Sequence, residues 1–349
     1  MKVIEATNVR DALPKAVAYI LRNGDEEDTR LGRALVSPTP VTIHYEYPKQ
    51  HVLVNEIRDA NPFFHLIEAM WMLAGRDDGV FLDPYIKDFS KLYSKDGVVM
   101  DAYGQRWRHG LGYDQLHDII NQLRKDSMTR QAVLQMWGAG RDDLRAFSMK
   151  PCNLVVTFRI QEHQLDMAVF NRSNDLIWGC CGANAVHFPI MQEYVASMIG
   201  KEVGEYWQIS NNLHLYEKHI ISLGDKTGNQ TLVEALTTES SCYEPSLALM
   251  SYPEHFDEEL GEVIKMIEDI NKDLPVYTGN TSNTFLSQVV VPMAMAHRSY
   301  KKKDMDFAFE CINEVIALDW QKAGREWLQR RQQSGCLPLK NNRDKVNER

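Results

Sequence analysis

This sequence of 349 residues lacks two features: cysteines at regular spacings and long apolar runs. Its six cysteines show neither the spacing of a disulfide framework nor that of a zinc site, which indicates a reducing compartment and no bound metal. No apolar run approaches the roughly 18 residues that a membrane span needs. The N-terminus also has no apolar signal-peptide core. We therefore expect a cytoplasmic protein without a metal and without membrane contact.

Glycine-rich phosphate loops and an excess of positive charge are also missing. The stretch Gly179-Cys180-Cys181-Gly182 is predicted to be a turn and not a phosphate cradle. A formal net charge of -9 and an isoelectric point near 5.7 argue against a nucleic-acid-binding surface. The length is sufficient for a large buried core. A small free ligand is more compatible with this composition than a nucleic acid is.

The most informative segment begins at Cys152. It is followed by an apolar run, 154–160, with strand composition, and by a second strand-like run, 165–170, which leads directly to Arg172 and Ser173. A hairpin of these two runs would bring an arginine near a cysteine. An adjacent arginine lowers the pKa of a thiol and can also hold the phosphate of a substrate. The segment therefore predicts a nucleophile beside a phosphate site.

Other polar residues occur in apolar surroundings. Glu68 lies within the helical pattern 62–74, where a carboxyl group is costly unless it is paired or functional. A purely structural alternative is an ion pair between Glu68 and Arg76. Farther along, His214 and Tyr216 are two residues apart and would share one side of an extended segment.

The remaining pattern is mainly helical, especially toward the C-terminus. Amphipathic spacing predicts helices, and one further run, 42–47, has strand composition. The helices are expected at 9–22, 62–74, 113–125, 184–199, 254–274, 284–300 and 305–332. We divide the chain into a catalytic core at 1–222, a mainly helical extension at 223–339 that packs on the core, and a charged tail at 340–349.

Taken in order, the motifs resemble the thymidylate synthase family over roughly residues 15 to 220. This resemblance implies an α+β fold, with a large mixed β-sheet flanked by helices and sheets that stack across a homodimer interface. The motifs that carry it are the glutamate helix ending in Trp71-Met72-Leu73-Ala74-Gly75, the block Tyr103-Gly104-Gln105-Arg106-Trp107-Arg108, Thr129-Arg130 ahead of Trp137, Pro151-Cys152, Arg172-Ser173-Asn174-Asp175, Asn184, and His214-Leu215-Tyr216.

The chemistry implied by the resemblance is covalent. Cys152 would add to C6 of a pyrimidine nucleotide, so that C5 can attack the methylene of the cosubstrate 5,10-methylenetetrahydrofolate. Glu68 would organise the water and protons around the base, and Tyr103 would assist removal of the C5 proton.

The same resemblance implies a binding site for a pyrimidine deoxynucleoside monophosphate. Each role is carried to a matching position of this sequence. Arg172 and Ser173 would hold the 5′-phosphate with Arg130 from the second subunit, and Arg30 or Arg33 would complete the clamp; Asn184 would face the pyrimidine edge, His214 and Tyr216 the 3′-hydroxyl, and Asp175 the pterin.

The chain differs from the synthases at residues that would act in the last step of the reaction. The synthases have two tryptophans in the folate-binding segment, at positions matching Phe89 and Leu92, and one of them shields an exocyclic methylene from water. The corresponding segment here, 88–97, contains no tryptophan. Smaller side chains at these two positions should let water reach the exocyclic methylene. Addition of water there gives a hydroxymethyl group instead of a methyl group. The alternative is that Phe89 shields sufficiently and the product is thymidylate.

Base choice depends on Asn184. Its carboxamide can match the O4 and N3–H edge of uracil, whereas an aspartate at this position suits the amino group of cytosine. We therefore expect conversion of dUMP to 5-hydroxymethyl-dUMP. The alternatives are hydroxymethylation of dCMP, thymidylate synthesis, and an inactive nucleotide-binding homologue. The string Gly-Ala-Asn-Ala-Val-His-Phe at 182–188 is similar to the hydroxymethylase-like branch, which includes phage enzymes, and a phage-encoded enzyme would act in the host cytoplasm.

Overall fold

The computed structural model describes residues 1–138, 140, 142, 150–237, 243, 249, 253–275, 281–333 and 335. The charged tail expected at 340–349 lies outside the described residues. Within them, no helix is both long enough and apolar enough to cross a membrane.

A mixed sheet of six strands forms the centre of the core, as the predicted α+β class requires. Two neighbouring pairs, β1 with β4 and β9 with β11, are parallel, and the other neighbours are antiparallel. The strand order is β1 (Lys2–Ala6), β4 (Val41–Tyr45), β11 (Glu202–Ser210), β9 (Gln164–Asn171), β8 (Asn153–Gln161) and β7 (Val133–Gln135).

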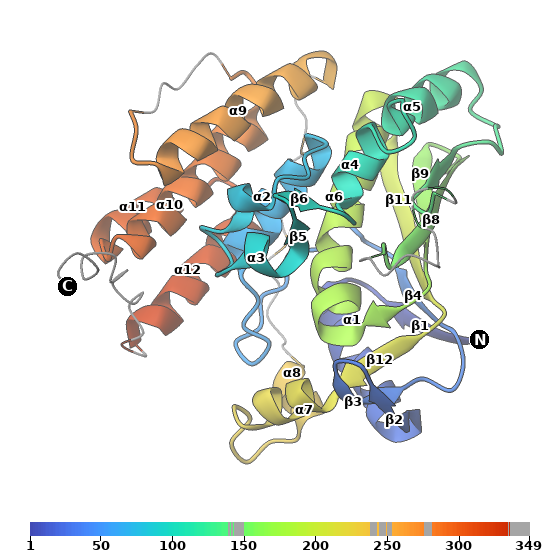
Figure 1. Cartoon of the computed structure of the whole chain (residues 1–349), viewed down its shortest axis with the longest axis vertical. Coiled ribbons are helices and arrows are strands. Elements are labelled where there is room, and N and C mark those ends of the chain that lie inside the picture. The colour runs from blue at the N-terminus through green and yellow to red at the C-terminus, as the bar shows by residue number, and fades with distance from the viewer. Residues whose placement is uncertain are drawn as a thin grey trace.

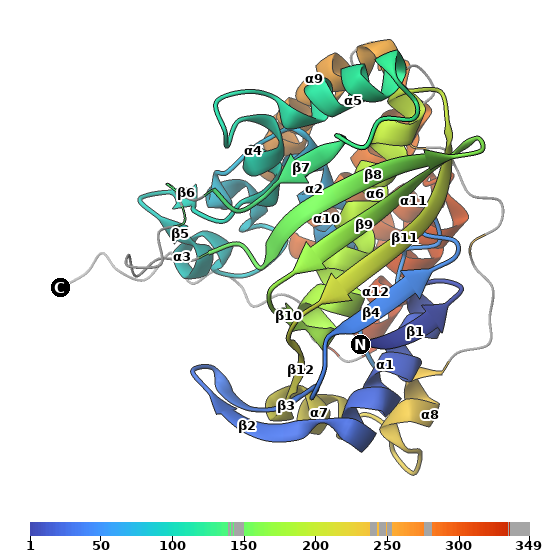
Figure 2. The same cartoon turned by 90° about the vertical axis from the view of Figure 1, so that its right-hand side faces the viewer.

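Among the described residues, helices cover one face of this sheet and none covers the other. Figure 2 shows the strands in front, with the helices behind them. Leu165, Met167 and Val169 are buried on the covered face, as the alternation in the sequence predicted. The core helices are α1 (Val9–Asn23), α2 (Pro62–Leu73), α4 (Tyr103–Arg108), α5 (Gln115–Lys125) and α6 (Asn184–Met198).

Local sequence explains where the two helices nearest the site begin. The side chain of Asn61 accepts a hydrogen bond from the backbone of Phe64, and Pro62 occupies the first turn of α2. Helix α6 follows a segment of wide helical turns, Leu176–Ala183, which is kinked at Cys181 and Gly182. The turn predicted at 179–182 therefore occurs at Cys181 and Gly182, whose backbone angles are non-helical, whereas the residues on either side of this kink are helical.

A second sheet lies at one end of the core (Figures 1 and 2). Asp175 pairs with His214 in parallel register, and Tyr216 pairs with Ala34 in antiparallel register. This sheet thus joins two parts of the predicted nucleotide site. Its order is β10 (Asn174–Asp175), β12 (Leu213–Tyr216), β3 (Gly32–Val36) and β2 (Asp25–Thr29). Helices α7 (Glu217–Gly224) and α8 (Leu232–Leu236) lie at this end of the core, whereas α3 (Phe89–Tyr93), β5 (Ser94–Lys95) and β6 (Val98–Val99) lie beside α2 (Figures 1 and 2).

The C-terminal helices form a layer against α2 (Figure 1). Phe63 of α2 lies 5.3 Å, between ring centroids, from both Trp327 and His297. An ion pair of 2.9 Å joins Arg108 of α4 to Asp257. Helix α2 is therefore enclosed between the core and this layer. The layer consists of α9 (Phe256–Asn271), α10 (Val291–Lys301), α11 (Met305–Asn313) and α12 (Leu318–Gln333).

The prediction of one helix at 305–332 is wrong. Helix α11 ends at Asn313, and the backbone of Ile316 donates instead to the carbonyl of Gln288 at 3.2 Å. The side chain of Gln321 then satisfies the carbonyls of Asn313 and Val315. Tertiary hydrogen bonds of this kind replace the helical ones, and they leave no periodic signal in the sequence.

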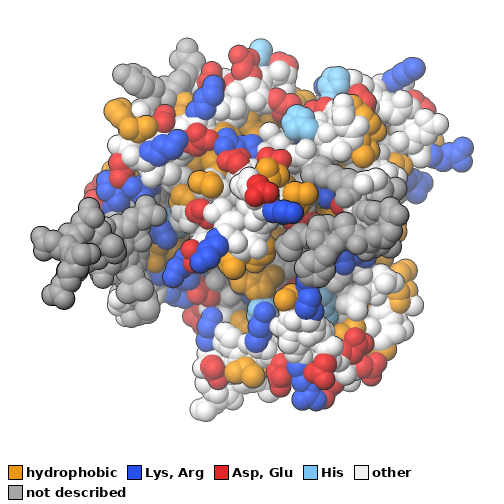
Figure 3. Space-filling model, in the orientation of Figure 1, with side chains coloured by type: hydrophobic (Ala, Val, Ile, Leu, Met, Phe, Trp, Pro, Cys, Tyr) orange, Lys and Arg blue, Asp and Glu red, His pale blue; other side chains and the backbone are white. Residues whose placement is uncertain are grey.

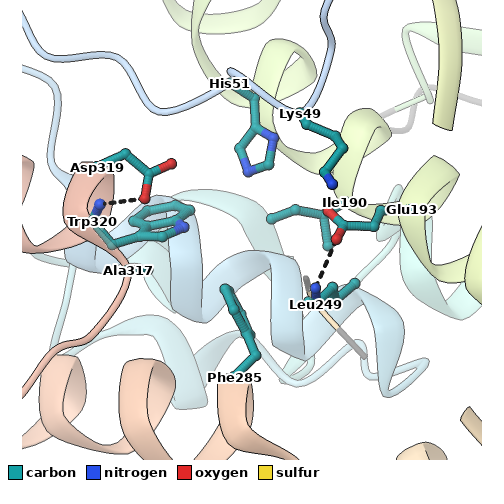
Figure 4. A pocket seen from close by; sticks show the side chains of 9 residues that line it. All are labelled: Lys49, His51, Ile190, Glu193, Leu249, Phe285, Ala317, Asp319 and Trp320. Carbon is teal, nitrogen blue, oxygen red and sulfur yellow. Dashed lines mark hydrogen bonds between the residues drawn. The ribbon is translucent and has the colours of Figure 1, made fainter. Parts of the chain in front are cut away.

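A cavity of about 10 Å³, room for about one water molecule, lies between α6 and the C-terminal layer (Figure 4). Glu193 accepts a hydrogen bond from the backbone of Leu249, and Asp319 accepts one from the backbone of Trp320. Burial raises the pKa of both carboxyl groups, that of Asp319 to about 6. On the side of the molecule seen in Figure 3, acidic and basic side chains are interspersed.

Candidate active site

Cys152 and Arg172 lie together at the ends of the central hairpin. The backbone N–H of Arg172 donates to the carbonyl of Cys152 at 2.9 Å, and the guanidinium lies 3.9 Å from the sulfur. The same guanidinium donates to the carbonyls of Pro151 and Lys150, each at 3.0 Å, and lies over the ring of Trp137. The predicted approach of arginine to cysteine is therefore confirmed. Ser173 follows, half-buried, between Arg172 and β10.

The expected lowering of the thiol pKa is wrong for the site as a whole. Burial raises the pKa of Cys152, Arg172 lowers it, and the carboxyl groups of Asp101 and Asp175 raise it again, so the net shift is upward. Desolvation penalises the thiolate more than one arginine favours it. Asp101 was not found from the sequence, where an aspartate two residues before the Tyr103 block carries no distinct signal.

Tyr103 begins α4 and lies beside the nucleophile. Its hydroxyl oxygen accepts a hydrogen bond from the backbone N–H of Asn153 at 3.3 Å. Burial, followed by the charges of Cys152 and Asp101, raises the tyrosine pKa above its ordinary value. The hydroxyl is therefore neutral at physiological pH, and it can orient a water or pass on a proton but does not act as a phenolate.

Glu68 projects from α2 toward α6. Its Oε2 lies 3.3 Å from Nε2 of His187. Burial raises the pKa of Glu68 to about 8, with a further increase from Asp101, and burial lowers that of His187 to about 3. At neutral pH the pair is therefore a neutral acid facing a neutral imidazole. The alternative ion pair is wrong, because Arg76 pairs with Asp78 and with Glu268 on α9.

The largely buried acid at position 68, whose side chain is 15% exposed, should destabilise the protein as the pH rises. Folded Glu68 retains its proton up to pH 8 or so, whereas in the unfolded chain it loses it near 4.5, so the free energy of unfolding falls between these values. We expect Glu68→Gln to unfold with wild-type stability below this window and to be more stable, by on the order of 1–3 kcal/mol, at pH 8. Urea unfolding across this range measures the difference. The exposed Glu262→Gln variant is the control, and parallel curves for wild type and Glu68→Gln would contradict the assignment.

Asp175 and His214 are neighbours across β10 and β12. Burial acts to raise the pKa of Asp175, but hydrogen bonds from His219 and from the backbone of Trp178 and Ile177 outweigh it, and the net shift is downward. Asp175 is therefore a carboxylate at neutral pH. Burial lowers the pKa of His214, whose ring lies 5.0 Å from that of Tyr216.

The arginines expected from other parts of the chain are less close to the nucleophile. Arg30 and Arg33 are exposed on the β2–β3 hairpin, where Arg33 pairs with Glu26. Arg130 is exposed before β7. In that strand Val133 pairs with Thr157, which places Arg130 at the opposite end of β8 from Cys152, roughly 16 Å or more along the strand.

The two residues at the positions of the synthase tryptophans have different surroundings. Phe89 is 8% exposed and packs on Phe64 of α2, one turn before Glu68, with 6.0 Å between ring centroids. Leu92 is 63% exposed. They do not form one continuous wall. An aromatic side chain that the sequence did not single out, Trp178, is 51% exposed next to Asp175.

Asn184 begins α6 and is buried. Its side-chain nitrogen donates to Oδ1 of Asn174 at 3.1 Å. Within the described residues, no group of three or more histidine, cysteine, aspartate or glutamate side chains is arranged to hold a metal.

A cysteine beside an arginine at the end of a mixed sheet, with a largely buried glutamate and a neutral tyrosine, is an arrangement of the kind that covalent catalysis requires. The profile of the thymidylate synthase family matches residues 13–239. The chain belongs to this family. It is therefore a one-carbon transferase, since the family acts on pyrimidine deoxynucleoside monophosphates with methylenetetrahydrofolate as cosubstrate.

Individual relatives show the same affiliation. The chain is 40% identical over 342 residues, 95% of each protein, to the deoxyuridylate hydroxymethyltransferase of Pseudomonas phage M6. It is 37% identical over 212 residues to the deoxyuridylate hydroxymethyltransferase of Bacillus phage SP01, a match that spans 57% of this chain and 55% of the relative. It is 24% identical over 210 residues to the thymidylate synthase of Buchnera aphidicola subsp. Schizaphis graminum, spanning 58% of this chain and 78% of the relative.

Proposed function

We propose that this protein is a deoxyuridylate hydroxymethyltransferase, which converts dUMP to 5-hydroxymethyl-dUMP. The observation that carries the proposal is the identity of 40% to a phage enzyme of that name over 95% of both chains. Because the match includes the C-terminal helices, it covers more than the part shared with the synthases.

In the proposed reaction Cys152 adds to C6 of dUMP, and C5 then bonds to the methylene carbon that the cosubstrate supplies. Loss of the C5 proton and release of tetrahydrofolate leave an exocyclic methylene, to which water adds. The C6–sulfur bond then breaks and releases the hydroxymethyl product. Neutral Tyr103 and neutral Glu68 can exchange protons through water during these steps, and Arg172 with Ser173 would hold the phosphate, completed by Arg30 or Arg33.

The surroundings of the site support capture of water. Phe89 is turned into its packing contact with Phe64, and Leu92 is exposed, so neither supplies the broad aromatic wall of the synthases. The carboxyl group of Asp101 interacts with both Glu68 and Cys152. It could orient a water molecule there.

The folate would bind beside Asp175 and Trp178. Charged Asp175 can accept hydrogen bonds from the pterin, and the exposed ring of Trp178 beside it offers a flat surface for stacking. These side chains fit a planar donor-rich ligand. Asn184 would read the uracil edge, and His214 with Tyr216 would bind the 3′-hydroxyl of deoxyribose.

The open face of the sheet supports a homodimer. The strand registers place Val155, Phe170 and Ile209 in one row across β8, β9 and β11, on the uncovered side seen in Figure 2. Trp207 lies in the neighbouring row. An apolar row of this kind is typical of a face that another subunit covers. Since Arg130 is far from its own Cys152, stacking of two such faces would let it serve the partner's phosphate site. The dimer would act in the cytoplasm, that of the host if a phage encodes it.

Mass analysis of the products tests the proposed reaction. The enzyme is incubated with 5,10-methylenetetrahydrofolate and either dUMP or dCMP. We expect 5-hydroxymethyl-dUMP together with tetrahydrofolate. A methyl product with dihydrofolate would make the protein a thymidylate synthase. A hydroxymethyl product from dCMP alone would reassign the base, and no product from either would indicate an inactive homologue.

A further inference from the structure

A continuous chain of side-chain amides leads from a backbone carbonyl to Asn184. Gln208 donates through Nε2 to the carbonyl of Cys180 at 3.0 Å. Asn174 donates through Nδ2 to Oε1 of Gln208 at 2.7 Å, and to the hydroxyl of Ser210 at 3.0 Å. Asn184 in turn donates through Nδ2 to Oδ1 of Asn174 at 3.1 Å. We refer to Gln208 and Asn174 as the amide relay.

The relay has a fixed direction. A backbone carbonyl can only accept, so Gln208 must turn its NH₂ group toward Cys180 and its oxygen toward Asn174. Asn174 must then direct its NH₂ group to Gln208 and its oxygen to Asn184. The same rule determines the orientation of the Asn184 amide, which turns its NH₂ group toward Oδ1 of Asn174. If Asn184 were flipped, two amide oxygens would face each other without a hydrogen between them.

Burial prevents water from relaxing this constraint. The exposed fraction is 0% for Gln208, 2% for Asn174 and 6% for Asn184. Close packing supports the arrangement, because a Cβ atom at Gly179 would lie 2.5 Å from Oδ1 of Asn174. Buried amides without a partner are costly, so flipping one member would disturb all of them.

We propose that Gln208 and Asn174 are positioning residues that lock the amide of Asn184 in one orientation and thereby make the enzyme select one pyrimidine. This inference rests on the proposed function, in which Asn184 reads the edge of the base. Uracil presents O4 as an acceptor and N3–H as a donor, whereas cytosine presents a donor and an acceptor at the same two places. A freely rotating amide could match both bases, and a locked amide matches one.

The test measures binding of dUMP and dCMP to the full-length protein by titration calorimetry, without folate. Gln208→Met keeps the length of the side chain and removes both polar groups. We expect the ratio of the two dissociation constants to move toward one by roughly tenfold or more, because one orienting hydrogen bond is lost. Gln192→Met is the matched control, since Gln192 is also 0% exposed and donates to the backbone of Leu165, Gly204 and Glu205, but does not contact Asn184.

A second comparison separates positioning from a general loss of structure. If the relay acts through Asn184, Gln208→Met should have no further effect on the ratio in an Asn184→Ala background. If Gln208→Met does not fold, Gly179→Ala, which crowds Asn174 from the other side, replaces it in the same measurements.

The outcomes for the two proposals can be told apart. An unchanged ratio in the relay variants, or an equal change in Gln192→Met, would overturn the relay while leaving dUMP hydroxymethylation intact. A wild-type preference for dCMP that the relay variants abolish would support the relay and contradict the choice of dUMP. If the wild-type protein bound neither nucleotide, both would be wrong.

Discussion

Replacing Cys152 with alanine should abolish the release of tritium from C5-labelled dUMP. Release requires the addition of sulfur to C6, and a methyl group cannot supply a nucleophile, so we expect a loss of at least about a thousandfold. Binding of dUMP should persist, because Arg172 remains. Cys311→Ala is the control, since Cys311 is a buried cysteine that lies in α11, outside the candidate site. Release by Cys152→Ala at an appreciable rate would exclude covalent catalysis by this residue.

The same variant tests whether Arg130 serves the other subunit. Arg130→Ala should also be nearly inactive if its guanidinium completes a phosphate site. After the two inactive variants are mixed and allowed to exchange subunits, about half of the dimers are mixed, and each has one intact site. We therefore expect recovery of about a quarter of the wild-type activity. No recovery, although exchange is shown by native mass spectrometry, would place Arg130 in its own subunit's site or outside any site.

Gly104→Ala should cost more stability than any conservative surface change. A Cβ atom at Gly104 would overlap the backbone of Met72, lying 2.5 Å from its carbonyl carbon, and backbone cannot move aside as a flexible side chain does. We expect a loss of roughly 3 kcal/mol in the free energy of unfolding, from overpacking. Catalysis should fall as well, because Tyr103 precedes Gly104 and would move with α4.

A second glycine-to-alanine substitution, at a position with free space, separates the effect of steric overlap from the effect of replacing glycine itself. Gly261→Ala in α9 meets nothing within 4 Å, so it should stabilise the protein by about 0.5–1 kcal/mol. Thermal unfolding of both variants and their turnover with dUMP give the comparison. Equal stability for the two variants would show that α2 and α4 are not packed as closely as the structure indicates.

Much of the fold was predictable because local and tertiary preferences agree. The alternation at 165–170 and the apolar stripe of α5 both correspond to buried faces. Asn61 followed by Pro62 marks the start of α2. The break between α11 and α12 was not predictable, because it depends on the hydrogen bond from Ile316 to Gln288 in another helix. The wide turns before α6 were missed for a similar reason.

The site was predictable in its order along the chain but not in its electrostatics. A hairpin brings Arg172 to Cys152 because the two strands have nearly equal length. The direction of the thiol pKa depends on burial and on Asp101, and neither can be read from neighbouring residues. In the sequence, His187 appeared only as a member of the string at 182–188. Nothing there indicated that it would face Glu68 of α2 from α6.

The enclosure of α2 has a consequence for how this enzyme can be shortened or recombined. The family profile ends at residue 239, yet Phe63, one turn and a half before Glu68, packs on Trp327 and His297. A catalytic unit cut at the end of the profile would therefore expose the helix that holds the buried acid. We therefore expect the scaffold to lose stability without the C-terminal helices, and a chimera with a shorter synthase to need other apolar side chains that cover α2.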